Sequence, residues 1–168
     1  DGRRVERSRE DINLVVAEAC ELAANAFPSD ILEIEQHFAD HSPIVQIDRV
    51  QIQQVIYNLL RNAVDAMGSS TSKDVIVSIA EIDKLMVEIS VRDYGPGLPG
   101  HVRPKLFEPF FSTKKQGMGM GMGLYTCQRI VEGHDGRIWA ESSDDGGTTI
   151  RFTLPLAGSA ADGTGSVH

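Results

Sequence analysis

Alternating glycines are the feature of this sequence that most directly suggests chemistry. Gly117, Gly119, Gly121 and Gly123 stand at every second position, immediately before an apolar helical pattern. Glycine at this spacing destabilises regular secondary structure, so it is favoured only where the backbone bends sharply or approaches a ligand closely. The free N–H groups and the positive end of the following helix attract anions. The stretch therefore indicates a phosphate-binding turn, with a purely flexible loop as the alternative.

Asp93 is a second candidate, because it ends an apolar strand pattern just before Gly95 and Gly97. A carboxylate in this position can cap the turn through backbone hydrogen bonds. It can equally accept a hydrogen bond from the exocyclic amine of adenine, as a fixed polar contact in an otherwise apolar pocket. The sequence leaves both interpretations open.

Two asparagines, Asn58 and Asn62, lie four residues apart on a long helical pattern and therefore share one face of that helix. They stand close to its apolar boundary, where an amide without a partner costs about 1 to 3 kcal/mol. A magnesium ion that also binds phosphate oxygens would be a suitable partner, because Mg²⁺ prefers oxygen ligands. An ordinary solvated helix face is the alternative.

The elements that would position these residues follow from hydrophobic periodicity. Helical spacing predicts helices that begin near Asn13, after the N-cap residue Asp48, and near Leu124. Period-two patterns predict strands at 31–38, 44–47, 75–79, 85–91, 137–142 and 148–154. Strands joined by short turns, including the turn at 40–43, are expected to pair in antiparallel fashion.

The predicted fold class is therefore α+β. We expect a two-layer α/β sandwich with a mixed, mostly antiparallel sheet and about three helices on one face. A doubly wound nucleotide-binding fold would alternate single strands with helices and place its glycine motif after the first strand. The order of elements in this chain disfavours that fold.

Composition is that of an ordinary soluble globular domain, with 41% hydrophobic and 24% charged residues among 168. The formal net charge of −8 argues against nonspecific binding of nucleic acid or of an anionic membrane, because such proteins use a basic surface. Cys20 and Cys127 lack metal-site spacing and fall in helical patterns, so we expect two buried, reduced thiols. No apolar run in the sequence approaches the roughly 20 residues of a membrane span, which favours a cytoplasmic domain without direct membrane contact.

Three parts make up the predicted domain organisation. Residues 1–11 carry interspersed charges and are interpreted as a linker. Residues 12–156 form the folded domain, and residues 157–168, rich in glycine, serine and alanine, form a disordered tail. Because the sequence begins at Asp1 without a methionine, we expect an excised fragment of a longer protein.

Four motifs together resemble those of the catalytic ATP-binding domain of sensor histidine kinases, in the Bergerat-fold group that also contains gyrase, Hsp90 and MutL. Residues 48–63 resemble the N box, residues 93–97 the G1 box, residues 106–114 the F box and residues 119–124 the G2 box. The similarity extends from about residue 13 to residue 155. The Phe-Phe-Ser-Thr-Lys form of the F box is most similar to the branch of oxygen- and nitrogen-sensing kinases.

The resemblance implies a role for each matching residue. Asn62 would bind Mg²⁺, Asn58 would contact a phosphate or a metal-bound water, and Asp93 would bind adenine. The remaining nucleotide contacts would come from Gly95 and Gly97 beside the base, Gly119, Gly121, Gly123 and Leu124 beside the phosphates, Phe110 with Phe107 and Phe111 in a lid, and Thr148 or Thr149 near adenine.

Two positions depart from the family pattern. Many members carry a lysine three positions after the metal-binding asparagine and an arginine just after the paired aromatic residues, where this chain has Asp65 and Ser112. The phosphate charge must then be met by another cation. Lys114 is the best candidate, with Lys115 and Arg61 behind it.

The implied function is transfer of the γ-phosphate of ATP·Mg²⁺ to a histidine on a separate dimerisation domain, which the parent protein would connect to a response regulator receiver domain. None of the five histidines in this chain has the setting of that acceptor. We therefore expect a monomeric fragment with little activity alone, because transfer needs a nucleophile in line with the γ-phosphate. The alternatives are an ATPase of the same fold, which uses a glutamate where this chain has Asn58, and a nucleotide-binding module without kinase activity.

Overall fold

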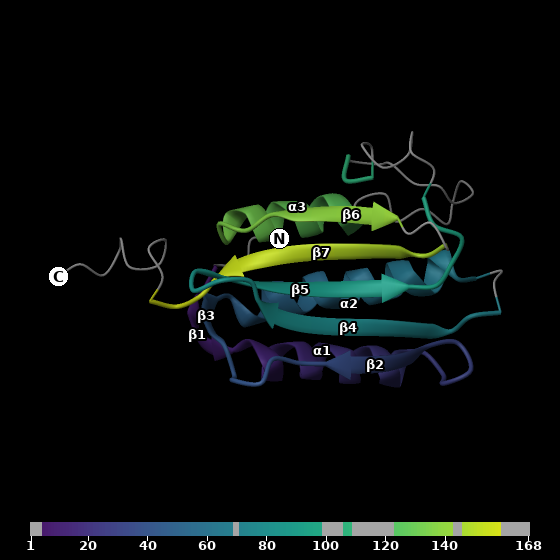
Figure 1. Ribbon diagram of the computed structural model, residues 1–168, viewed down its shortest axis with the longest axis horizontal. Coiled ribbons are helices and arrows are strands. Elements are labelled where there is room, and N and C mark those ends of the chain that lie inside the picture. The colour runs from purple at the N-terminus through teal and green to yellow at the C-terminus, as the bar shows by residue number, and fades with distance from the viewer. Residues whose placement is uncertain (1–4, 69–70, 99–105, 109–122, 143–145, 159–168) are drawn as a thin grey trace.

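The computed structural model describes residues 5–68, 71–98, 106–108, 123–142 and 146–158. Within these residues, three helices cover one face of a five-stranded sheet (Figure 1). The helices are α1 (Ile12–Ala26), α2 (Arg49–Ala66) and α3 (Gly123–Gly133). The strands are β1 (Ser8–Asp11), β2 (Glu33–His37), β3 (Ile44–Ile47), β4 (Asp74–Glu81), β5 (Met86–Asp93), β6 (Ile138–Ser142) and β7 (Thr148–Pro155). The predicted α+β sandwich is confirmed.

The five-stranded sheet has the order β2-β4-β5-β7-β6, in which only the β2–β4 pair is parallel. Strand β5 lies at its centre, between β4 and β7. Valine and isoleucine alternate with polar residues along β5, as expected for a strand with one face on the core. The register of β5 with β7 pairs Asp93 with Thr148. The last residue of the central strand therefore lies beside the first residue of its neighbour.

Two predicted features of the N-terminal third are wrong. The strands flanking the turn at 40–43 do not pair with each other, because β2 pairs in parallel with β4. Strand β3 instead pairs in antiparallel fashion with β1, which lies within the stretch interpreted as a linker. The physical reason is that β2 is an edge strand with a mostly exposed burial pattern, and such a strand specifies its partner only weakly.

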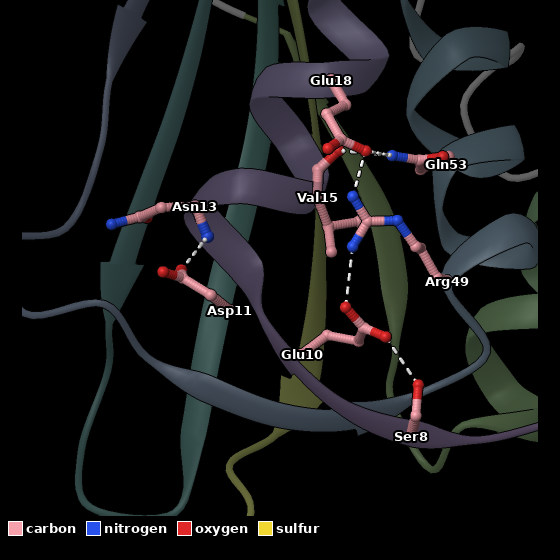
Figure 2. A network of polar contacts seen from close by, with 8 residues as sticks. All are labelled: Ser8, Glu10, Asp11, Asn13, Val15, Glu18, Arg49 and Gln53. Carbon is pink, nitrogen blue, oxygen red and sulfur yellow. Dashed lines mark hydrogen bonds and ion pairs between the residues drawn. The ribbon is translucent and has the colours of Figure 1, made fainter.

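Glu10 of β1 has structural partners, which Figure 2 shows around Arg49 at the start of α2. The Arg49 guanidinium donates to Glu10 of β1 at 2.7 Å and also to Glu18 of α1. Gln53, one turn along α2, donates to Glu18 at 3.0 Å and to the carbonyl of Val15 at 3.1 Å. A stretch of alternating charge that resembles a solvated linker is therefore part of the folded unit.

The core lies between the helices and the sheet, and both cysteines contribute to it. Cys20 in α1 and Cys127 in α3 are buried free thiols, as predicted. Burial raises the pKa of each thiol to about 12, so both stay protonated at neutral pH. Among the described residues, no helix combines the length and the apolar character needed to cross a membrane.

Candidate functional site

Asp93 is a buried carboxylate at the end of the central strand, with 5% of its surface exposed. Its Oδ1 accepts the backbone N–H of Gly95 at 2.9 Å and that of Thr148 at 3.3 Å. Burial raises the pKa of Asp93, while these two N–H groups and the charge of Arg92 act in the opposite direction. Asp93 thus caps the turn through one oxygen, and neither of these two hydrogen bonds uses the second oxygen, Oδ2.

The turn after Asp93 is held by close backbone contacts that require glycine. A Cβ on Gly95 would lie 2.9 Å from the carbonyl oxygen of Ala66, at the end of α2. A Cβ on Gly147, in the turn before β7, would lie 2.5 Å from the carbonyl oxygen of Asp93. Gly97 and Gly147 also have φ angles of 84° and 87°, which favour glycine. The turn is therefore packed between the end of α2 and the β6–β7 turn.

Helices α2 and α3 run antiparallel, and two hydrogen bonds set their register. The backbone N–H of Asp48 donates to Nε2 of His134 at 3.1 Å, and the Sγ of Cys127 donates to the carbonyl of Val55 at 3.8 Å. Seven residues separate Asp48 from Val55, and seven separate Cys127 from His134. The start of α3 therefore lies beside the second half of α2.

Asn58 and Asn62 are half-buried on this second half of α2. The Asn58 side chain hydrogen-bonds to the thiol of Cys127, so it faces α3. Continuing the antiparallel register four residues from Cys127 to Gly123 places Gly123 level with Leu59, between the two asparagines. The N-terminal end of α3, with its free N–H groups, is thus level with both amides.

The other predicted site residues divide into two groups. Gly123 and Leu124 begin α3, and Thr148 and Thr149 are buried at the start of β7. Phe107 packs against the core. The second group lies outside the described residues. It comprises the predicted site residues Phe110, Lys114, Gly119 and Gly121, together with Phe111 of the predicted lid.

The predicted metal site depends on amides rather than on a carboxylate or histidine cluster. Across the described ranges, no group of three or more His, Cys, Asp or Glu side chains could hold a metal ion. Asn62 offers one amide oxygen, which suits a magnesium ion that takes its other ligands from phosphates and water. Arg61 is half-buried and Asp65 exposed on the same part of α2.

The sequence alone did not predict a role at this site for three residues that lie near it: Cys127, Ser142 and Gly147. Cys127 contacts Asn58 across the helix interface, which the apolar face of α3 could only have hinted at. Ser142 accepts the N–H of Leu98 at 2.8 Å. Gly147 follows Gly146 between the strands predicted at 137–142 and 148–154, and a Gly-Gly pair often marks the positive φ angles that both residues have.

His134 connects the far ends of α2 and α3. It is buried, its Nδ1 donates to the carbonyl of Ile130 at 2.8 Å, and its Nε2 accepts the N–H of Asp48. Asp48 is also buried, and its Oδ2 accepts the backbone N–H of Glu6 at 2.9 Å. The neutral imidazole therefore holds the first residues of the domain and both helices together.

Acid should destabilise the fold through His134. Burial lowers its pKa from 6.5, as does the charge of Arg7, against the opposing carbonyl of Ile130 and the charges of Asp48 and Asp135. As pH falls, the imidazole of His134 is therefore protonated at a higher pH in the unfolded chain than in the folded one. This stability contribution is complete above about pH 6.5 and is lost as pH falls through the lowered pKa.

Urea unfolding at pH 7.5 and pH 5.5 checks this expectation. His134→Gln should lose less free energy of unfolding between the two conditions than the wild type. The exposed His41, changed to glutamine, is the matched control and should behave as the wild type does. Equal losses in wild type and His134→Gln would contradict this account of His134.

Comparisons with known proteins identify the family of this chain. Residues 47–158 match the family described as histidine kinase-, DNA gyrase B- and HSP90-like ATPases. The sensor protein FixL of Bradyrhizobium diazoefficiens is 39% identical over 152 residues, which are 90% of this chain and 30% of that protein. The C4-dicarboxylate transport sensor protein DctS of Rhodobacter capsulatus is 39% identical over 148 residues, which are 87% of this chain and 22% of that protein. The chain thus spans less than a third of either relative.

Solved structures give the same result at the level of the fold. The nucleotide-free catalytic domain of the histidine kinase ThkA has a TM-score of 0.75 and 30% identity, over 89% of this chain and 95% of that one. The mycobacterial sensor histidine kinase MprB has a TM-score of 0.77 and 26% identity, over 90% of this chain and 98% of that one. The chain therefore belongs to the family of histidine kinase-, DNA gyrase B- and HSP90-like ATPases, among the catalytic domains of sensor histidine kinases.

Proposed function

We propose that this domain binds ATP with Mg²⁺ and donates the γ-phosphate to a histidine on a separate dimerisation domain. The observation that carries the proposal is the side chain of Asp93, which is buried and accepts both of its hydrogen bonds from described residues through Oδ1. A buried charge is costly unless it has partners. The exocyclic amine of adenine is a suitable donor for Oδ2, and a carboxylate rejects the carbonyl that guanine has at the same ring position.

The other end of the nucleotide would lie between α2 and α3. Asn62 would provide an oxygen ligand to Mg²⁺, and Asn58 would contact a phosphate or a metal-bound water. The N–H groups at Gly123 and Leu124 and the positive end of α3 favour phosphate charge. When bound, the metal ion would neutralise charge that develops on the transferred phosphoryl group.

The remaining assignments extend the same site. Gly95 and Gly97 would shape the base pocket, with Thr148 contacting adenine through water. Phe110, Lys114, Gly119 and Gly121 would close over the phosphates, with Lys114 as the cation that replaces those absent at Asp65 and Ser112. The protein kinase assignment draws support from the sensor protein FixL and from the histidine kinase catalytic domain of ThkA.

The phosphoryl acceptor would lie outside this chain. The chain covers 30% of FixL and 22% of DctS, so such relatives have ample length for other domains. We propose a dimerisation domain of the same or a partner kinase chain as the acceptor, and a response regulator receiver domain as the next recipient. This chain would be a monomer that acts in the cytoplasm.

Phosphoryl transfer in trans tests this function, with Asn62→Asp as the decisive variant. The purified domain, [γ-³²P]ATP and Mg²⁺ are mixed with a separately purified dimerisation domain that carries its histidine. Wild type should label that histidine. Asn62→Asp should transfer at least about tenfold more slowly, because a new carboxylate repels the phosphates and changes the ligands of the metal.

The matched control is Gln54→Glu, which introduces the same charge at an exposed position of the same helix. It should transfer at nearly the wild-type rate. Wild-type transfer by Asn62→Asp would remove Asn62 from the site. Rapid ATP hydrolysis without labelling of any histidine would favour an ATPase instead.

A further inference from the structure

Ser142, the last residue of β6, connects two turns that lie far apart in the sequence. Its Oγ accepts the backbone N–H of Leu98 at 2.8 Å, across 44 positions in the chain. The same hydroxyl donates to the carbonyl of Gly147 at 3.4 Å. One side chain thus links the end of the turn after β5 to the turn before β7.

The space around this hydroxyl is small. Gly97 has a φ of 84°, and a Cβ built there would lie 3.0 Å from Oγ of Ser142 and 3.2 Å from the carbonyl oxygen of Gly147. At Gly97, the turn after β5 therefore approaches the hydroxyl closely because the residue has no side chain. A hydroxyl at 142 fits this contact because it is both a hydrogen-bond donor and an acceptor.

These contacts complete a ring of hydrogen bonds around Asp93. The Oδ1 of Asp93 accepts N–H groups from Gly95, in the first turn, and from Thr148, just after the second turn. Ser142 links the same two turns through Leu98 and Gly147, and its Cα is the register partner of Thr148. Loss of the Ser142 link would remove the hydrogen bond that ties Leu98 to this side of the ring, and the two hydrogen bonds to Asp93 Oδ1 would remain.

We propose that Ser142 is a positioning residue of the nucleotide site, which fixes the orientation of the Asp93 carboxylate toward the base. This inference rests on the proposed binding of ATP. Ser142 makes no contact with the base in this account. It acts through Leu98 and Gly147, by keeping Oδ2 of Asp93 aimed at one position.

The test compares Ser142→Ala with Ser142→Thr, which restores the hydroxyl. Calorimetric titrations with non-hydrolysable ATP and GTP analogues, each with Mg²⁺, give the affinity and the preference for adenine. Ser142→Ala should bind the ATP analogue about 3- to 10-fold more weakly, in keeping with one lost hydrogen bond. Its ATP-to-GTP preference should fall by a similar factor, and Ser142→Thr should recover at least half of both.

Ser78→Ala is the control, because it removes a hydroxyl from β4 of the same sheet, away from the turn. It should keep the wild-type affinity and preference. A lower melting temperature alone would not change the preference between two nucleotides, so that ratio separates positioning from general stability. A wild type that does not bind the ATP analogue would overturn the proposed function. A wild type that binds, with an unchanged preference in Ser142→Ala, would overturn only the inference about Ser142.

Discussion

Replacing Asp93 by asparagine is expected to remove most nucleotide binding while leaving the apo domain at least as stable as the wild type. The asparagine Oδ1 can still accept the N–H groups of Gly95 and Thr148. Its amide nitrogen, however, would meet the adenine amine with a donor instead of an acceptor. A hydrogen bond to a charged group contributes roughly 1.5 to 3 kcal/mol, so affinity should fall about 10- to 150-fold.

The stability of Asp93→Asn follows from the sign of the pKa shift. Burial raises the pKa of Asp93 above its ordinary value of 3.8, so the folded state holds this proton more tightly than the unfolded state. The resulting contribution to stability is complete below about pH 3.8 and is lost as pH rises through the raised pKa. At neutral pH the buried charge therefore costs stability that asparagine does not.

Melting temperatures at pH 7 and near pH 4 check both parts of this expectation. Asp93→Asn should melt at or above the wild-type temperature at pH 7, and this difference should shrink toward pH 4. The exposed Asp83, changed to asparagine, serves as a control for the loss of one negative charge. A variant that binds nucleotide normally, or that is clearly less stable than the wild type at pH 7, would contradict the role assigned to Asp93.

Replacing Gly147 by alanine is expected to have the largest effect on stability and to weaken nucleotide binding as well. A Cβ there would lie 2.5 Å from the carbonyl oxygen of Asp93, and the residue has a φ of 87°. The left-handed conformation costs a non-glycine residue about 1 to 3 kcal/mol, and the contact forces the backbone of Asp93 to move. For a domain of this size, such a cost lowers the melting temperature by about 3 to 10 °C.

Gly158→Ala separates the two causes, because Gly158 has a φ of 84° and, within the part of the chain that the structure describes, nothing lies within 4 Å of a Cβ built there. It should lose only the conformational part and keep nucleotide affinity. Thermal unfolding and calorimetric titration of both variants make the comparison. If the two alanine variants lose the same stability and bind nucleotide equally well, the Gly147–Asp93 contact has no role in the site.

The elements that local pattern determines were predictable from the sequence. Asp48 as an N-cap and the helical spacing of Asn58 and Asn62 depend on residues within one or two turns, and the structure has them as expected. Strand β5 alternates cleanly because one face lies against the helices. Each of these local structures is determined by residues within about ten positions, so it can be predicted without knowledge of the rest of the fold.

The features that failed or were missed depend on distant partners. The charges of β1 resemble those of a solvated linker because Arg49, the partner of Glu10, is 39 positions away. The parallel partner of β2 requires a crossover through β3 and α2, which no local pattern reveals. The role of Ser142 depends on its hydrogen bonds to Leu98 and Gly147, and the sequence pattern alone predicts it only as a strand residue.

Asp93 lies between these two cases. Its position before Gly95 indicated a capped turn as one of two interpretations, and the hydrogen bond from the Gly95 N–H at 2.9 Å agrees with that one. The sequence could not reveal that Asp93 is buried or that the Thr148 N–H also donates to its Oδ1, because both follow from the pairing of β5 with β7. That combination makes Asp93 a candidate for base recognition as well as for capping.

Calorimetric titration of the wild-type domain with a non-hydrolysable ATP analogue, with and without Mg²⁺, tests the central claim most directly. We predict saturable binding of one nucleotide per chain that is tighter with Mg²⁺, and a loss of at least tenfold in affinity for Asp93→Asn under the same conditions. No binding by the wild type at millimolar nucleotide, or equal affinity for wild type and Asp93→Asn, would contradict the assignment of this site.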